Sequence, residues 1–339
     1  MLKRLPSFPS LNFSIRFLIG VFFASVSQET FAQIANESKE SFFIGAELLY
    51  EAPQSLYNID ADSLKDLKRS KYPKPPPESI KYKITLNVFY SCESEKIEES
   101  QKVTVYETIA DNRISLLELK LDSVSKKSST TNTPCSNEQE LCMKTAHYSQ
   151  EIELKRLLGG YDITWAYCCF NQDIQNLENT SKQGLSLTTH IPDIIDKINS
   201  TPVFTEQLIT TFCANNLTNI NLSSSDLDGD SLVCKLKPIY SHRIKSKNSN
   251  NDNEFAQGDI ISQNIITEKG PFEQIKYSDG FSYKKPLQNS ELKLNQETGD
   301  LEITPIIDGR FLIGISIEEY RNKILINEIQ RVFILNIKM

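Results

Sequence analysis

The chain has 339 residues, which is enough for two domains of ordinary size, each with its own core. Its formal net charge is −7 and it has no long cluster of lysine and arginine, which argues against a nucleic acid as partner. One tryptophan and three histidines leave few residues for zinc binding or acid–base catalysis.

The first 32 residues have the pattern of a secretory signal peptide. Lys3, Arg4 and Arg16 supply positive charge, residues 17–26 form an apolar core, and Ala32 places a small residue at the expected cleavage point. The apolar run is too short for a membrane-spanning helix, and no later run is long enough. We therefore expect an exported protein, secreted or at the cell surface, with no membrane-spanning segment in the mature chain.

Residues 33–198 are expected to form an all-β domain. Short runs rich in aromatic and β-branched residues alternate with turns, and the run 81–91 alternates most clearly between polar and apolar side chains. Such a series is typical of an immunoglobulin-like sandwich. Residues 51–79 are an insertion with a short helix at 60–70 and a stiff, proline-rich connector at 73–77. The polar segment 123–137 is expected to be a mobile loop. The expected strands are 42–50, 81–91, 102–107, 114–121, 148–155, 161–170 and 185–191.

A second β pattern begins at Asn199 and continues to the end of the chain, so residues 199–339 are expected to form a second β-sandwich. Residues 246–254 are a polar, asparagine-rich loop. The expected strands are 203–212, 217–222, 231–240, 259–267, 292–294, 301–304, 311–318 and 323–337.

An acidic turn, Asp226-Leu227-Asp228-Gly229-Asp230, directly precedes one of these strands. Closely spaced carboxylates can supply the oxygen ligands that a hard cation such as Ca²⁺ requires. The turn is not an EF-hand, because Ser231 and Lys237 stand where that loop needs glycine and glutamate. Aspartate and glycine are also the ordinary residues of solvated turns. Both interpretations remain open on the residues alone.

Four phrases in the first half form one series that resembles a known family. In order they are Phe43–Tyr50 (FIGAELLY), Val88–Cys92 (VFYSC), Gly159–Trp165 (GGYDITW) and Cys168–Asn171 (CCFN). The series resembles the N-terminal region of large secreted surface proteins of Bacteroidota that are linked to gliding motility and type IX secretion. The chain departs from that pattern at Ala46, Ser91 and Phe170, where the family has glycine, aspartate and arginine. Those proteins are usually longer and end in a sorting domain, which we do not expect in this sequence, so the export route beyond the signal peptide stays open.

The second half is similar to a cadherin-like repeat. The similar phrases are the start at Asn199–Phe204, the DxDGD turn at Asp226–Asp230, the run Thr298–Phe311, and Glu318–Arg321, which contains the EYR of the surface family. The resemblance implies a sandwich in which the first, second and last of these phrases meet at one pole, near the domain junction. We therefore expect Ca²⁺ to stiffen that junction. The expected ligands are Asp226, Asp228, Asp230, either Glu318 or Glu319, and Asn199. A solvated turn is the alternative.

Export makes the seven cysteines a question of disulfide pairing, and an odd number leaves at least one thiol over. They are Cys92, Cys135, Cys142, Cys168, Cys169, Cys213 and Cys234. Cys135 and Cys142 flank a short loop and are expected to pair locally. Cys92 is expected to pair with one cysteine of the 168–169 doublet. By elimination, Cys213 is expected to pair with Cys234.

Two catalytic interpretations are less consistent with the sequence. The 168–169 doublet with His190 could form a thiol nucleophile, but exported cysteines are more often oxidised. Glu47 and Asp162 could be the paired carboxylates of a glycosidase, but nothing in the sequence places them together. We therefore expect a non-enzymatic adhesion or structural module that binds surface proteins or extracellular polysaccharide. The alternative is a polysaccharide-binding accessory domain or hydrolase subunit. A carbohydrate platform needs exposed, coplanar aromatic side chains, and the single tryptophan, Trp165, lies inside an expected strand, which does not favour this alternative.

Overall fold

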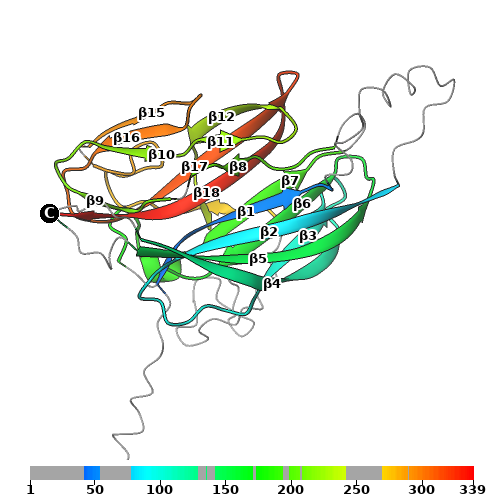
Figure 1. Ribbon diagram of the computed structural model, residues 1–339, viewed down its shortest axis with the longest axis horizontal. Coiled ribbons are helices and arrows are strands. Elements are labelled where there is room, and N and C mark those ends of the chain that lie inside the picture. Colours follow the sequence, from blue (N-terminus) through cyan, green and yellow to red (C-terminus); the bar gives the residue numbers. More distant parts are fainter. Residues whose placement is uncertain are drawn as a thin grey trace, which may run out of the picture. The chain divides into compact units, whose positions relative to one another are not determined.

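The computed structural model describes most of the chain from residue 42 onward, and this part is all-β (Figure 1). The described helical element is a single 3₁₀ turn, η2 (Thr180–Lys182). The signal peptide, the helix at 60–70, the proline-rich connector, the loop at 246–254 and the strand at 259–267 lie outside the described residues. The described ranges are 42–53, 78–128, 135, 142–170, 173–193, 198–206, 208–241, 269–288 and 290–339.

The described residues of the first half form seven strands, in agreement with the sequence pattern. In β2 the buried residues alternate as expected, from Ile80 through Tyr82 and Ile84 to Leu86. The expectation of a loop from residue 123 is wrong as far as Ser128, because hydrogen bonding to β5 extends β4 to that residue despite its polar side chains. The strands are β1 (Phe43–Glu51), β2 (Ser79–Ser91), β3 (Ser100–Glu107), β4 (Arg113–Ser128), β5 (Cys142–Lys155), β6 (Tyr161–Tyr167) and β7 (Leu185–Ile191).

The second half has mostly short strands followed by one long hairpin. The hairpin joins β17 to β18 through Asn322 and Lys323, both with positive φ, as a two-residue hairpin turn requires. The strands are β8 (Val203–Phe204), β9 (Thr211–Cys213), β10 (Thr218–Asn221), β11 (Ser224–Ser225), β12 (Ser231–Leu236), β13 (Tyr240–Ser241), β14 (Glu273–Gln274), β15 (Glu291–Leu294), β16 (Asp300–Thr304), β17 (Gly309–Arg321) and β18 (Ile324–Lys338).

One 13-stranded sheet contains strands of both halves. Its order is β12-β17-β18-β1-β2-β5-β4-β3-β6-β7-β13-β14, and β9 lies parallel to β18. β1 lies beside β18 in Figure 1 and is antiparallel to it, with Gly45 opposite Phe333. A Cβ at Gly45 would lie 2.1 Å from the carbonyl oxygen of Val332, so the close approach of the two strands requires glycine there. Two smaller sheets have the orders β10-β16-β15 and β11-β8.

Two hydrophobic clusters lie against β1 and β18, and these strands contribute side chains to both. In β1, Leu48 and Tyr50 belong to one cluster and Leu49 to the other. In β18, Val332 belongs to the first cluster and Phe333 to the second. Successive side chains of a strand point to opposite faces, so the shared strands are buried on both sides. The first cluster is built mainly by residues before 198 and the second mainly by residues after it. Division of the chain into two tandem domains stays a prediction.

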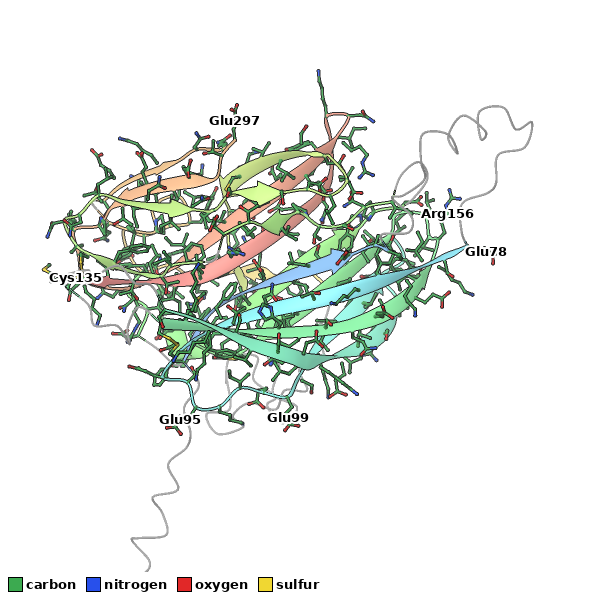
Figure 2. The ribbon with its side chains drawn as sticks, viewed as in Figure 1. Glu78, Glu95, Glu99, Cys135, Arg156 and Glu297 are labelled. Atoms are coloured by element: carbon green, nitrogen blue, oxygen red, sulfur yellow. A yellow bond between two sulfur atoms is a disulfide. The ribbon has the colours of Figure 1, made fainter. Side chains whose placement is uncertain are left out.

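The disulfides differ from all three expected pairings. The bonds are Cys92–Cys142, Cys135–Cys213 and Cys168–Cys169, and Cys135 is labelled in Figure 2. The register of β2 and β5 explains the first bond, because it places Ser91 opposite Met143 and brings the Cα atoms of Cys92 and Cys142 to 5.4 Å.

Cys234 therefore remains a free thiol, contrary to the pairing with Cys213 reached by elimination. It lies in β12 opposite Ile317 and belongs to the second hydrophobic cluster. Cys213 ends β9 beside Lys338 of β18, and its sulfur is bonded to Cys135. Burial raises the pKa of the Cys234 thiol to about 12, so it is protonated at neutral pH.

Candidate metal site

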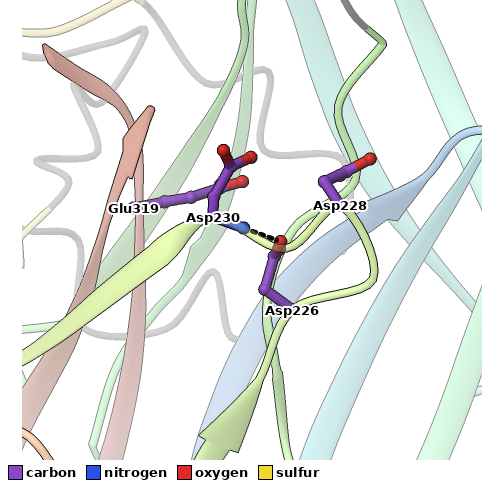
Figure 3. A group of neighbouring side chains, drawn as sticks. All are labelled: Asp226, Asp228, Asp230 and Glu319. Carbon is purple, nitrogen blue, oxygen red and sulfur yellow. Dashed lines mark hydrogen bonds between the residues drawn. The ribbon is translucent and has the colours of Figure 1, made fainter. Parts of the chain in front are cut away.

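Three aspartates of one turn and a glutamate of a distant strand come together ahead of β12 (Figure 3). Asp226, Asp228, Asp230 and Glu319 each offer a carboxylate oxygen, and these oxygens lie within 4.8 Å of one another. The turn connects β11 to β12, and its Gly229 has a positive φ of 78°. The backbone N–H of Asp230 donates to Asp226 Oδ1 at 2.8 Å, which closes the turn. The three aspartates of the sequence prediction are thus brought together as expected.

The choice between Glu318 and Glu319 is decided by the alternation of side chains along β17. Glu319 points toward the aspartates and is fully buried, with an exposed fraction of 0%. Glu318 is not part of the cluster. It accepts from Lys235 Nζ at 2.6 Å and Lys237 Nζ at 2.7 Å, and the hydroxyl of Tyr320 donates to it at 2.7 Å. Burial alone would raise the pKa of Glu318, but these three hydrogen bonds lower it to about 2.

Asn199 lies beside the cluster and contacts Glu319. Its Nδ2 donates to Glu319 Oε2 at 3.1 Å and to the hydroxyl of Tyr50 at 3.0 Å. Its Oδ1 accepts from Arg321 Nη2 at 2.5 Å. In this arrangement the side-chain oxygen of Asn199 faces the guanidinium, and its role as a ligand stays a prediction. The amide of Asn199 fixes the orientation of the Glu319 carboxylate.

The cluster is attached to β1, a strand of the other half of the chain. The backbone N–H of Ser200 donates to Asp228 Oδ2 at 2.7 Å, and Ser200 Oγ accepts from the backbone N–H of Ala52 at 2.9 Å. The hydroxyl of Thr201, the next residue, accepts from the backbone N–H of Tyr50 and donates to the carbonyl of Tyr50. The residues that follow the expected domain boundary therefore connect the acidic turn directly to the end of β1.

The cluster has more buried negative charge than its neighbours compensate. Within the described residues, Glu319 Oε1 and Asp226 Oδ2 are buried and have no hydrogen-bond partner. Burial, together with the charges of Asp226 and Asp230, outweighs the hydrogen bonds from Asn199 and Asn327 and raises the pKa of Glu319 to about 8. Burial also raises the pKa of Asp226. A buried carboxylate oxygen without a partner is costly, and a bound cation or a proton could offset that cost.

The donor set fits a hard divalent cation. All four candidate ligands are carboxylates, which suit Ca²⁺, Mg²⁺ or Mn²⁺, whereas zinc and copper favour imidazole or thiolate ligands. The two buried oxygens without partners are the observation that supports this fit, since a bound cation would satisfy both. The cation would be held by Asp226, Asp228, Asp230 and Glu319, and it would join the turn to β17.

The residues weighed for catalysis are held in separate interactions. Cys168 and Cys169 are bonded to each other, so neither is a thiolate nucleophile here. His190 Nδ1 lies 2.8 Å from Asp162 Oδ1. Glu47 instead pairs with Arg331, whose Nε donates to Glu47 Oε2 at 2.6 Å. The glycosidase arrangement of two facing carboxylates is therefore absent for Glu47 and Asp162.

Sequence reasoning missed the roles of Arg321 and Asn327. Arg321 stood in the sequence only as the end of a Glu-Tyr-Arg phrase, and nothing there indicated that its guanidinium would bind Asp230. Asn327 lies opposite Glu319 in the β17–β18 hairpin and donates to its carboxylate at 3.3 Å. A regular hairpin with its turn at Asn322 and Lys323 would have aligned Glu319 with Ile326, because the bulge between Glu319 and Tyr320 that places Asn327 there leaves no signal in the sequence.

No family model matches the chain, and no curated protein matches it. Among solved structures, the extracellular domains 3–5 of Drosophila OTK align over 90% of this chain and 88% of that chain, with 8% sequence identity and a TM-score of 0.18. A likeness of this size does not establish a shared fold. In the described ranges, no helix is long and apolar enough to cross a membrane.

Proposed function

We propose that this chain is an exported, non-enzymatic adhesion or structural module in which Ca²⁺ stiffens the junction between two β-sandwich units. The observation that carries the proposal is the buried Glu319 oxygen without a partner, which lies among three aspartates of a turn fastened to β1. A cation there would connect the acidic turn, β17 and, through Ser200, the end of β1.

The two clusters on opposite faces of β1 and β18 support two sandwich units, residues 33–198 and 199–339. In this arrangement the units share a sheet instead of being joined only by a linker. The immunoglobulin-like character of the first unit rests on its series of short strand runs, and the cadherin-like character of the second unit rests on the phrases in its sequence.

Ca²⁺ is preferred among the hard cations because its flexible coordination accepts carboxylates from a turn and from a distant strand. Sites in extracellular modules bind Ca²⁺ with dissociation constants of roughly 10⁻⁴–10⁻³ M, so in calcium-rich surroundings the ion would have a structural role and not a signalling role. At about a hundredfold excess over the dissociation constant it would stabilise the fold by about 2.7 kcal/mol.

Export is supported by the charged, apolar and small-residue pattern of the first 32 residues and by three disulfides, which persist in oxidising compartments. The proposed partners are surface proteins or extracellular polysaccharide. Trp165 is 1% exposed and its indole donates to Gln101, so it cannot stack on a sugar at the surface. This favours the adhesion module over the alternative of a polysaccharide-binding accessory domain or hydrolase subunit.

Thermal melting of the purified exported protein, with Ca²⁺ and with a chelator, tests the proposal. We expect Ca²⁺ to raise the melting temperature of the wild type and to have no effect on Glu319→Gln. Glu318→Gln is the matched control, because the same change is made one residue away on the opposite face of β17. It should lower stability but keep the response to Ca²⁺. Equal melting temperatures of the wild type in Ca²⁺ and in chelator would contradict calcium binding. The acidic turn without a bound metal ion would then be the remaining interpretation.

A further inference from the structure

Arg321 already supplies one positive charge to the acidic cluster. Its Nε donates to Asp230 Oδ1 at 2.9 Å and to Oδ2 at 3.1 Å, and its Nη2 also donates to Oδ2. The same Nη2 donates to Asn199 Oδ1. The guanidinium therefore engages both oxygens of Asp230, one of the four candidate ligands.

The charge of Arg321 also acts on Asp228 and Glu319, but it leaves two oxygens of the described cluster without a hydrogen bond. The guanidinium donates to Asp230 and Asn199, whereas Glu319 Oε1 and Asp226 Oδ2 have no hydrogen-bond partner among the described residues. The guanidinium is thus a partial substitute for a metal ion. It pairs with Asp230 and leaves Glu319 Oε1 and Asp226 Oδ2 without a hydrogen-bond partner in the described part of the chain.

A metal ion bound by all four carboxylates would lie close to this guanidinium. Two cations that share the oxygens of one carboxylate repel each other, and the repulsion is strong where both are shielded from water. Arg321 is the last residue of β17, adjacent to the turn at Asn322, and its side chain is 18% exposed. It can therefore turn toward solvent when a metal ion enters, whereas Glu319 has no exposed surface.

We propose that Arg321 is a built-in competitor for the cation at the Asp226–Asp228–Asp230–Glu319 site, which holds Asp230 when no metal is bound and is displaced from it on metal binding. The inference rests on the proposed calcium site and assigns the residue that sets its affinity. It follows that the metal-free fold depends on Arg321 and that the metal-bound fold does not. It also follows that calcium affinity is weaker than the four carboxylates alone would give.

Calcium titration of the exported protein by isothermal calorimetry tests the inference with Arg321→Gln. We expect this variant to bind Ca²⁺ at least about tenfold more tightly than the wild type, because the competing charge is removed. Its melting temperature should fall in chelator and recover in Ca²⁺. The matched control is Arg310→Gln, an exposed arginine at the opposite end of β17. It makes the same change in net charge and should leave both the affinity and the melting response as in the wild type.

The outcomes separate the inference from the calcium proposal. Affinity in Arg321→Gln equal to or weaker than the wild type, with stability lost both with and without Ca²⁺, would overturn the inference and show that Arg321 only positions Asp230. Binding by Arg321→Gln but not by the wild type would support the competition and remove calcium from the wild-type function. Absence of binding in both proteins would overturn both. If the metal-free variant unfolds, the variant is purified in Ca²⁺ and then diluted into chelator. The measurement then starts from the folded, metal-bound protein, so the test stays decisive.

Discussion

Thr201 joins the residues after the domain boundary to β1 through one hydroxyl group. Thr201 Oγ1 accepts from the backbone N–H of Tyr50 at 3.1 Å and donates to the carbonyl of the same residue at 3.0 Å, and all these groups are buried. The backbone N–H of Thr201 also donates to that carbonyl at 2.9 Å. Thr201→Val keeps the shape of the side chain and removes the hydroxyl. The Tyr50 carbonyl then retains a donor, whereas its N–H loses its acceptor.

The cost of one buried backbone donor without an acceptor is about 1–3 kcal/mol. The compact unit Ser41–Met339 has roughly 300 residues, and an unfolding entropy of about 2.1 cal/mol/K per residue gives about 0.6 kcal/mol/K for the unit. Thr201→Val is therefore expected to lower the melting temperature by about 2–5 °C.

Differential scanning calorimetry of Thr201→Val and Thr201→Ser measures this effect. Serine retains the hydroxyl, so its melting temperature should stay much closer to that of the wild type, with only the loss of one methyl group. Two results would contradict this reasoning: a melting temperature of Thr201→Val equal to that of the wild type, or equal decreases in Thr201→Ser and Thr201→Val. Either would show that the Tyr50 amide does not depend on this hydroxyl and that the described junction is wrong.

Three further predictions concern other parts of the chain. The lowered pKa of Glu318 means that its ion pairs stabilise the fold above about pH 4.5 and lose this effect as the pH falls toward about 2. In denaturant titrations, the difference in free energy of unfolding between wild type and Glu318→Gln should therefore decrease between these two pH values. A constant difference would contradict the assignment. Asn176→Leu should cost about 2–4 kcal/mol in urea unfolding, because the buried amide bonds the N–H and carbonyl of Leu312 and the carbonyl of Pro286; a neutral change would show that water replaces it. Thiol titration of the unreduced protein in denaturant should yield one thiol, and peptide mapping should place it at Cys234; a thiol recovered at Cys92 or Cys142 would contradict the β2–β5 bond.

Local patterns in the sequence were sufficient to predict most strands. The alternation in residues 81–91 predicted β2, and the apolar runs near the C-terminus predicted β17 and β18. The acidic turn was recognised because its carboxylates are neighbours in the chain. These features depend on interactions between residues close in the chain. The local order of polar and apolar side chains is therefore sufficient to predict them.

Features that depend on strand register could not be predicted from the same patterns. A shift of one residue exchanges Glu318 with Glu319, and only the pairing of β17 with β18 decides which one faces the aspartates. The Cys92–Cys142 bond follows from the register of β2 and β5. Pairing of β1 with β18 brings together residues almost 300 positions apart, for which the sequence has no local signal.

The central claim is a calcium ion held by Asp226, Asp228, Asp230 and Glu319 at the attachment of the acidic turn to β1. Calcium titration of the exported protein by isothermal calorimetry tests it most directly. The account predicts saturable binding of one Ca²⁺ with a dissociation constant of roughly 10⁻⁴–10⁻³ M, retained in Glu318→Gln and lost in Glu319→Gln. The same heats in all three proteins, or no saturable binding in the wild type, would contradict it.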